Sequence, residues 1–400
     1  MFIYKLQQFE LCNSNIFNLK FFEKDKQKIF IGHTIFKYLN KSKKKIDECQ
    51  DSWAAIKKYT NEYEYIHTPL SISKPAISKI KPLSRAFFKL IEILNYINYE
   101  NEKNINTFHL AEGPGGFIEA TKYYRNNKND KYFGMSLIDP EDTNVPGWNK
   151  AMFFFKSTPN AKIIDGADKT GNLYNIDNFN YCIERFKNSM EIITADGGFD
   201  FSIDFNKQEL MASRLIITEI FYAIVMQKQD GIFILKMFDT FLKISLEIIY
   251  ILSCFYTTIE ICKPNTSRMA NSEKYIVCTG FKLENSEEYT NVFREILIKL
   301  NNPDNKDKYI ESILKQDLSY FFKNKMEEVN AILGYKQISN ILTTMRYIEN
   351  NDKRTQKMQN IKNNNLKRCV EWCKENNIPY NNYSQNLSYG EHSNIFISKN

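Results

Sequence analysis

The chain has 400 residues, of which 43% are hydrophobic, 14% aromatic and 25% charged. At about 150 residues per domain this length predicts roughly two to three domains, and the hydrophobic share excludes wholesale disorder and a small disulfide-stapled fold. Lys and Arg number 54 against 47 Asp and Glu, a net charge of +7. This charge fits a polyanionic partner or simple solubility and does not distinguish the two.

The longest apolar stretches, Leu215–Met226 and Ile244–Ile261, are interrupted by Glu219 and Glu247, so we expect no membrane-spanning helix. The first residues lack an apolar segment with a cleavage site, so we expect no signal peptide. We expect an intracellular protein, cytoplasmic (a viral factory or virion included) or nuclear. Its eight scattered cysteines indicate reduced structural thiols and no metal site.

The first 75 residues predict a small appended module with a helix near Asp47–Tyr59. Its basic run Lys41–Lys45 is either a solvated face or part of an RNA-binding track. A second helix is expected over Ser84–Asn98, with Ser84 as its N-cap.

Residues 76–285 alternate short apolar runs with helical patterns, which predicts an α/β domain with a mostly parallel sheet of about seven strands. Only a loop separates the last two strands, so we expect them to form an antiparallel hairpin. The expected strands are Ile105–Ala111, Lys131–Ile138, Ala161–Asp165, Glu191–Ala195, Gly231–Met237, Thr257–Cys262 and Lys274–Thr279.

Residues 286–400 predict a helical C-terminal extension, with helices over Val292–Leu300 and Tyr309–Met326. The polar stretch at about 350–366, rich in Asn, Lys and Gln, is expected to be a linker.

A glycine-rich loop follows the first expected strand, in the segment Phe108–Phe117 (FHLAEGPGGF). Its spacing is neither GxGxxG nor a phosphate-binding P-loop. Such a tight turn at the carboxyl edge of a sheet suits a ligand with a compact charged end, for example the amino-acid part of S-adenosylmethionine, or is a structural turn only.

Four charged residues stand on the helix before the sheet or at strand ends on this same edge: Lys89, Asp196, Lys236 and Glu273. A lysine at the end of an apolar strand is costly to bury unless a carboxylate pairs with it. Taken singly, each has a simpler reading: a solvated helix residue for Lys89, a turn former for Asp196, a snorkelling side chain for Lys236 and a surface pair with Lys274 for Glu273.

The segments SRAFFKL, AEGPGGF, YFGMSL, TADGGFDF, ILKMFD and TSRMANSEKY occur in an order that resembles the FtsJ-like ribose 2′-O-methyltransferases, in particular the Adrift-type enzymes of capped mRNA. The resemblance covers about Ser84 to Phe281. It implies an S-adenosylmethionine-dependent Rossmann-like enzyme whose Lys-Asp-Lys-Glu tetrad is Lys89, Asp196, Lys236 and Glu273, hereafter the tetrad.

The chemistry of that reaction assigns roles within the tetrad. A ribose hydroxyl needs its proton removed, and a neutral lysine can remove it, so Lys236 is the candidate base, with Lys89 as a second cation nearby. Asp196 and Glu273 would orient the two amines. The reaction requires alignment and no metal.

The resemblance also implies binding residues. For the cofactor they are Glu112, Gly113, Pro114, Gly115, Gly116, Phe117, Ser136, Asp168 and Asn172, and for the RNA they are Arg85, Asn206, Lys207, Gln208, Ser267, Arg268 and Asn271. His109 and Asn172 stand where relatives commonly carry acids, and His109 is otherwise read as a core histidine. A methylated cap suits an aromatic pair, for which Trp53 and Trp148 are candidates no better than core residues.

The leading hypothesis is therefore a 2′-O-methyltransferase acting on capped mRNA, with other capping or transcription proteins as further partners. The alternatives are a methyltransferase for ribosomal or transfer RNA, and a catalytically silent RNA-binding subunit. A viral source is compatible with the composition.

Overall fold

The computed structural model describes residues 1–22, 28–99, 103–142, 145–198, 207–349, 355–381 and 383. The chain divides into two compact units. Unit 1 comprises Met1–Glu48 and Pro82–Leu342, and unit 2 comprises Cys49–Lys81 and Thr343–Asn400. The expected appended module of residues 1–75 is therefore shared between both units.

Unit 1 is built on a twisted eight-stranded sheet with the order β1-β8-β9-β7-β6-β3-β4-β5. Strands β3 to β7 pair in parallel, whereas β9 is antiparallel to both β7 and β8, and β1 is antiparallel to β8. The strands are β1 Phe2–Leu6, β3 Asn106–Leu110, β4 Lys131–Met135, β5 Ala161–Ile163, β6 Met190–Ala195, β7 Gln227–Met237, β8 Tyr256–Lys263 and β9 Lys274–Phe281.

All seven expected strands are confirmed, as is the antiparallel pairing of the last two. The eighth strand, β1, was not predicted. It adds to the free edge of β8 with Phe2 opposite Lys263 and Leu6 opposite Ile259, which explains why the first residues belong to unit 1.

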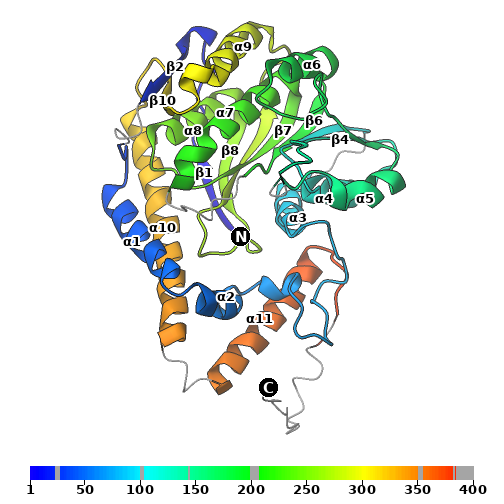
Figure 1. Cartoon of the computed structure of the whole chain (residues 1–400), viewed down its shortest axis with the longest axis vertical. Helices are drawn as coiled ribbons and strands as arrows, with labels where there is room; N and C mark the ends of the chain where they lie inside the picture. Colours follow the sequence, from blue (N-terminus) through cyan, green and yellow to red (C-terminus); the bar gives the residue numbers. More distant parts are fainter. Residues whose placement is uncertain are drawn as a thin grey trace. The chain divides into compact units, whose positions relative to one another are not determined.

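Helices cover both faces of this sheet (Figure 1). One face carries α6 (Ile176–Phe186), α7 (Gln208–Met226) and α8 (Lys243–Phe255), with α9 (Glu287–Asn301) packed on α6 and α7. The other carries α3 (Ala86–Ile97), α4 (Gly116–Arg125) and α5 (Met152–Ser157). Helix α7 is apolar almost all round because it is buried along its length. The expected helices at 84–98 and 292–300 correspond to α3 and α9. The expected N-cap Ser84 is wrong, because α3 begins at Ala86 and Arg85 occupies the N-cap position.

A small second sheet pairs β2 (Phe17–Phe22) with β10 (Tyr309–Leu314), antiparallel. The helix expected over 309–326 is wrong for its first half, since residues 309–314 form this strand and α10 (Tyr320–Glu349) begins later. Short 3-10 turns lie at Ser14–Ile16, Glu64–Ile66, Asn149–Ala151 and Pro303–Asn305.

Helix α1 (His33–Asp47) carries the basic run, and the run is not uniformly solvated. Lys41, Lys44 and Lys45 are exposed, but Lys43 is buried and its Nζ lies 2.6 Å from Asp239 Oδ2. Neither a fully solvated face nor a continuous basic track describes this run.

Unit 2 packs α2 (Gln50–Thr60) and the turn at Glu64–Ile66 against α11 (Thr355–Glu375). The core of α11 is the buried set Leu366, Cys369, Val370, Trp372 and Cys373. The linker expected at about 350–366 is wrong for residues 355–366, which are helical, and its first part, 350–354, lies outside the described residues. The N-terminal half of α11 is polar and leads into this buried C-terminal half. Between them, Asn365 Nδ2 donates to Tyr59 O at 2.9 Å.

No helix among the described residues is long and apolar enough to cross a membrane. All eight cysteines lie in described ranges and are free thiols, seven of them buried. Within the same ranges no group of three or more His, Cys, Asp or Glu side chains could hold a metal ion.

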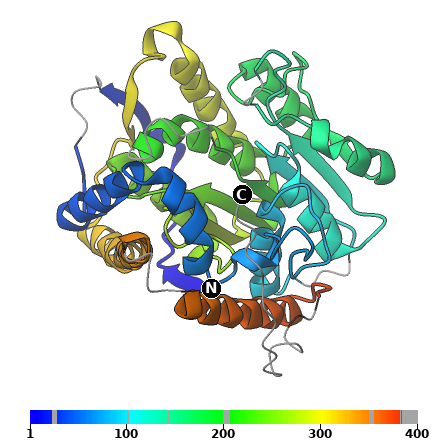
Figure 2. The same cartoon turned by 60° about the horizontal axis from the view of Figure 1, so that its bottom comes forward.

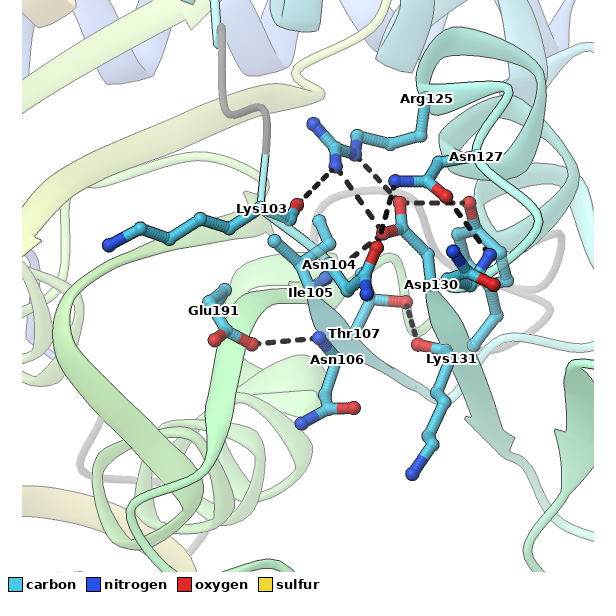
Figure 3. Close-up of polar contacts among 12 residues, drawn as sticks. Lys103, Asn104, Ile105, Asn106, Thr107, Arg125, Asn127, Asp130, Lys131 and Glu191 are labelled. Carbon is cyan, nitrogen blue, oxygen red and sulfur yellow. Dashed lines mark hydrogen bonds and ion pairs between the residues drawn. The ribbon is translucent and has the colours of Figure 1, made fainter.

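A buried ion pair ties together the starts of β3 and β4 (Figure 3). Asp130 accepts the backbone N–H of Ile105 at 2.9 Å and the Nε of Arg125 at 2.8 Å. Arg125 also donates from Nη2 to Lys103 O at 3.0 Å. The Asp130 carboxylate is fully buried, and within the described ranges it is stabilised by these donors and by Tyr132 OH at 3.3 Å.

We predict that Asp130→Ala lowers the free energy of unfolding of unit 1 by about 3–5 kcal/mol, because it leaves the buried Arg125 guanidinium unpaired. Denaturant unfolding followed by circular dichroism measures this. The control Lys128→Ala, at an exposed neighbour, should change it by no more than about 0.5 kcal/mol. Equal stability of the two variants would contradict this role.

Candidate active site

The carboxyl ends of the parallel strands open into one cavity of about 680 Å³ in unit 1. Its volume is in the range of small-molecule sites. It is lined by Ala111, Gly113, Ser136, Leu137, Asp142, Val145, Pro146, Gly171, Asn172, Leu173, Tyr174, Asp196, Gly198, Gln208, Leu215, Lys236 and Phe238. A lining of apolar side chains with a few polar groups is typical of a cofactor site.

The glycine-rich loop runs from β3 into α4 along one side of this cavity. Gly115 has φ +109°, which an L side chain rarely adopts. A Cβ on Gly116 would lie 2.1 Å from Ser84 Oγ, so only glycine lets α4 approach the chain before α3. Gly113 donates its backbone N–H to Ser136 Oγ at 3.0 Å, joining the loop to the end of β4.

Glu112 acts as the N-terminal cap of α4. Its Oε1 accepts the backbone N–H groups of Phe117 at 2.7 Å and Ile118 at 2.9 Å. Burial raises the pKa of Glu112 to about 8, although these two hydrogen bonds favour its anion. In this structure its carboxylate faces the helix terminus and does not line the cavity.

The first pair of the tetrad joins α3 to β9. Lys89 Nζ lies 2.7 Å from Glu273 Oε2, and both side chains are buried. Ser267 Oγ donates to the other oxygen, Oε1, at 2.7 Å. Burial alone would raise the pKa of Glu273, but the ammonium groups of Lys89, Lys236 and Lys263 outweigh it and hold the pKa below its ordinary value. Glu273 is therefore an anion.

The second pair joins the ends of β6 and β7. Lys236 Nζ lies 3.3 Å from Asp196 Oδ1 and donates to the Asp196 backbone carbonyl at 2.6 Å. Both side chains line the cavity. The neighbouring tyrosine on β9 links the pairs, because Tyr275 OH donates to Asp196 Oδ1 at 2.9 Å and lies 3.4 Å from Lys89 Nζ. The tetrad thus forms one continuous polar cluster.

The peptide between Asp196 and Gly197 is held at both ends. Its carbonyl accepts from Lys236, and its N–H donates to the carboxyl group of Glu219 on α7. Glu219 is buried, and burial raises its pKa to about 8 despite the opposing charge of Lys236. The turn after β6 is therefore held on one side by Glu219 of α7 and on the other by Lys236 of the tetrad.

The loop before Glu273 is fixed by two charged side chains. Glu92 on α3 accepts the backbone N–H groups of Asn265 at 2.8 Å and Thr266 at 3.2 Å. Lys263 Nζ donates to the backbone carbonyl of Glu273 at 2.6 Å. Burial lowers the pKa of Lys263 to about 7.

The structure brings three residues of the expected cofactor set into the cavity: Gly113, Ser136 and Asn172. Asp168 lies outside it and organises the loop around Gly171, accepting from Thr170 Oγ1 at 2.8 Å and Asn175 Nδ2 at 2.6 Å. Burial alone would raise its pKa, but these hydrogen bonds and those from the Thr170 N–H and Asn178 lower it to about 2. Glu112, Pro114, Gly115, Gly116 and Phe117 build the loop and the start of α4 behind the cavity lining.

The expected RNA residues lie in different settings. Gln208 lines the cavity and accepts from Ser272 Oγ at 3.1 Å. Asn271 accepts from Lys263 Nζ at 2.7 Å, while Ser267 is buried against Glu273. Arg85 directly precedes α3, and its buried Nη1 has no hydrogen-bond partner among the described residues. Arg268 lies on the loop before β9, and Lys207 is exposed. Asn206 is outside the described residues.

His109 is the core histidine that its position suggested. Its ring lies between Thr194 Oγ1 at 2.8 Å and Thr107 Oγ1 at 3.0 Å, fully buried. Burial lowers its pKa to about 3, so the ring is neutral. Trp148 is buried and packs edge-on against Phe155, and Trp53 is half-buried on α2 in unit 2.

Three functional residues were missed by sequence reasoning: Tyr275, Glu219 and Asp142. Tyr275 stands two residues after Glu273 in one motif, and alternation along a strand could have placed both on one face. Glu219 was noted only as an interruption of an apolar helix, although an acid in such a helix must find a donor. Asp142 lines the cavity from a loop that carries no local signal.

We predict that Gly197→Ala destabilises unit 1 by about 1–3 kcal/mol, because its Cβ would lie 2.3 Å from Glu219 Oε1 and 2.9 Å from the Ala111 Cβ. The matched control is Gly198→Ala, whose Cβ would lie no closer than 3.2 Å to Lys236 Nζ and 3.8 Å to the Phe238 ring. Thermal unfolding of both variants checks this. A Gly197 variant as stable as the Gly198 variant would be the contrary result.

The chain is similar in sequence to a known family and to named relatives. A model of the FtsJ-like methyltransferase family matches residues 82–281, half of the chain. Two relatives from Caenorhabditis briggsae are 28% identical to this chain: the cap-specific mRNA (nucleoside-2'-O-)-methyltransferase 1A over 252 residues, and its inactive counterpart 1B over 251. The matches cover 59% of this chain and 28% and 29% of the relatives, so the chain spans less than a third of their length. A solved ribosomal RNA methyltransferase from Plasmodium falciparum has a TM-score of 0.36 and 20% identity over 50% of this chain and 97% of that one. The chain belongs to the FtsJ-like methyltransferase family.

Proposed function

We propose that this chain transfers a methyl group from S-adenosylmethionine to the ribose 2′-hydroxyl of a 5′-terminal nucleotide of capped mRNA. The observation that carries the proposal is the polar cluster in which Lys89 pairs with Glu273, Lys236 pairs with Asp196, and Tyr275 joins the pairs beside the cavity. Family membership and the cap-specific name of one relative support the same reaction.

The cavity fits the proposed cofactor. Its volume of about 680 Å³ and its apolar wall of Leu137, Val145, Pro146 and Leu173 suit an adenine and a thioether. Gly113, Ser136, Asp142 and Asn172 supply polar groups for its ribose and amino-acid parts. When bound, S-adenosylmethionine supplies a methyl group activated by a sulfonium charge.

Lys236 is the proposed general base. A neutral lysine amine has two N–H bonds and one lone pair. The Lys236 ammonium of the ion pair would first lose one proton to solvent; its two remaining N–H groups would then donate to the carbonyl and carboxylate of Asp196, and its lone pair at the cavity wall would accept the proton of the ribose hydroxyl. The hydroxyl oxygen is then free to form the new bond to carbon.

The other members of the tetrad hold this arrangement. The Lys89 ammonium neutralises Glu273. Lys89 also lies next to the hydroxyl of Tyr275, which donates to Asp196, so both amines and both acids keep fixed positions. Because methyl transfer from a sulfonium creates no new charge at the oxygen, alignment is the main contribution of these residues.

The RNA is proposed to enter over Arg85, Lys207, Gln208, Arg268 and Asn271. Arg85 directly precedes α3, one turn before Lys89, and is half-buried; its guanidinium is proposed to contact a phosphate of the RNA. Acting on mRNA 5′ ends, the enzyme would work beside other capping or transcription proteins, in the cytoplasm, in a viral factory or in the nucleus.

A catalytically silent RNA-binding subunit is the second candidate, because one relative of equal identity carries the name of an inactive methyltransferase. The complete and mutually paired tetrad of this chain favours an active enzyme.

We predict that Lys236→Ala lowers the methyl transfer rate by about 10²–10⁴-fold, because it removes the proton acceptor, while S-adenosylmethionine affinity changes little. Transfer of radiolabelled methyl groups to RNA and calorimetric binding of the cofactor measure the two effects. The control Lys128→Ala removes an exposed lysine and should retain full activity. A Lys236 variant within tenfold of the unaltered enzyme would remove this residue as the base.

We further predict that a short capped RNA is methylated at least tenfold faster than the same RNA with a 5′-triphosphate. Nucleoside mass spectrometry identifies the methylated ribose. Equal rates on both RNAs would favour the ribosomal or transfer RNA alternative. No product from any RNA, with cofactor binding intact, would favour the silent subunit.

A further inference from the structure

Unit 2 carries almost all of the net charge of the chain. Its residues 49–81 and 343–400 contain 14 Lys and Arg against 8 Asp and Glu, so its net charge is +6 out of +7 for the whole chain. Unit 1, with the remaining 40 Lys and Arg against 39 Asp and Glu, is close to neutral. A separate unit with this excess has the electrostatic character of a polyanion-binding module.

Three lysines of unit 2 come from three separate elements and act on one another electrostatically, and we name them the lysine cluster: Lys58 on α2, Lys74 on the loop after Glu64–Ile66, and Lys362 on α11, whose Nζ lies at Leu70 of that same loop. Figure 2 brings this part of the chain forward. Burial lowers the pKa of Lys362, and the positive charges of Lys58 and Lys74 lower it further. Among the described residues, none of the three ammonium groups forms an ion pair with a carboxylate.

The surroundings hold the cluster in place without neutralising it. Lys362 Nζ lies 3.4 Å from Leu70 O and 5.8 Å from the centre of the Tyr65 ring, and Lys58 Nζ lies 5.4 Å from that of Tyr59. The loop that carries Lys74 is closed by its own hydrogen bonds, from Leu70 N to Lys74 O at 3.0 Å and from Lys74 N to Ser71 Oγ at 3.1 Å. Like charges that act on one another cost free energy, which phosphates placed beside them would recover.

We infer that the lysine cluster of unit 2 binds the sugar-phosphate backbone of an RNA chain. The choice of RNA rests on the proposed function, since the substrate supplies several phosphates along one strand. Three lysines on separate elements match successive phosphates better than one compact anion. A membrane surface is less well matched, because Ile72 is the only exposed large hydrophobic side chain among the described residues of unit 2.

The test measures binding of a fluorescent capped RNA to the full chain by anisotropy at several salt concentrations. The variant Lys58→Gln, Lys74→Gln, Lys362→Gln should bind more weakly at low salt. The slope of log affinity against log salt should decrease by about 3, because each lysine that is replaced leaves one phosphate without its cation. The same three positions changed to Arg should retain the slope of the unaltered chain.

A matched control changes three exposed lysines of unit 1, Lys128, Lys156 and Lys162, to Gln, which removes the same charge. It should leave the slope within about 1 of the unaltered chain. If the triple variant unfolds because Lys362 packs on Tyr65, the double variant Lys58→Gln, Lys74→Gln is used in its place. Its slope of log affinity against log salt should decrease by about 2.

An unchanged slope in the cluster variants would overturn the inference, and so would binding to phosphatidylserine vesicles that depends on the cluster while RNA binding does not. Methyl transfer by the unaltered chain is measured in parallel. If the chain transfers no methyl group but its RNA binding depends on the cluster, the proposed function is contradicted and this inference is supported. If the chain is active and its RNA binding does not depend on the cluster, the proposed function is supported and this inference is contradicted.

Discussion

Two ion pairs determine the arrangement of the active site. Lys89 and Glu273 form a buried pair, and Lys236 and Asp196 form a half-buried pair at the cavity wall, so each charge has an opposite charge and further hydrogen-bonding groups beside it. The sheet makes this possible. Strand β9 inserts between β7 and β8 with Tyr275 opposite Lys236, so the residues before β9 arrive next to the end of β7.

The same constraint explains the residues around the pairs. Lys263 and Glu92 fix the loop that delivers Glu273, and Glu219 fixes the peptide whose carbonyl accepts from Lys236. None of these side chains needs to touch a substrate. Their removal would free the loop or the turn that positions Glu273 or Asp196, so precision at the cavity depends on buried polar groups on neighbouring helices and strands.

The sequence was sufficient to predict seven of the eight strands of the main sheet and to select the four residues of the tetrad, because apolar runs and ordered motifs are local signals. Pairings distant in sequence were not predictable in this way. Strand β1 is stable only against β8, and β10 was misread as helix because Ile310, Ile313 and Leu314 have helical spacing. Lys43 appeared as part of a basic run, and only its partner Asp239, 196 residues later, shows that it is buried. The start of α11 is polar, and the buried surface that stabilises this helix lies nearer its C-terminus.

A crystal structure of the full chain with S-adenosylhomocysteine tests the central claim most directly. The account predicts the ligand in the cavity between Gly113 and Asn172, with its sulfur directed toward Lys236 Nζ and the two ion pairs preserved. A ligand bound elsewhere, or a sulfur turned away from a dispersed set of Lys89, Asp196, Lys236 and Glu273, would contradict it.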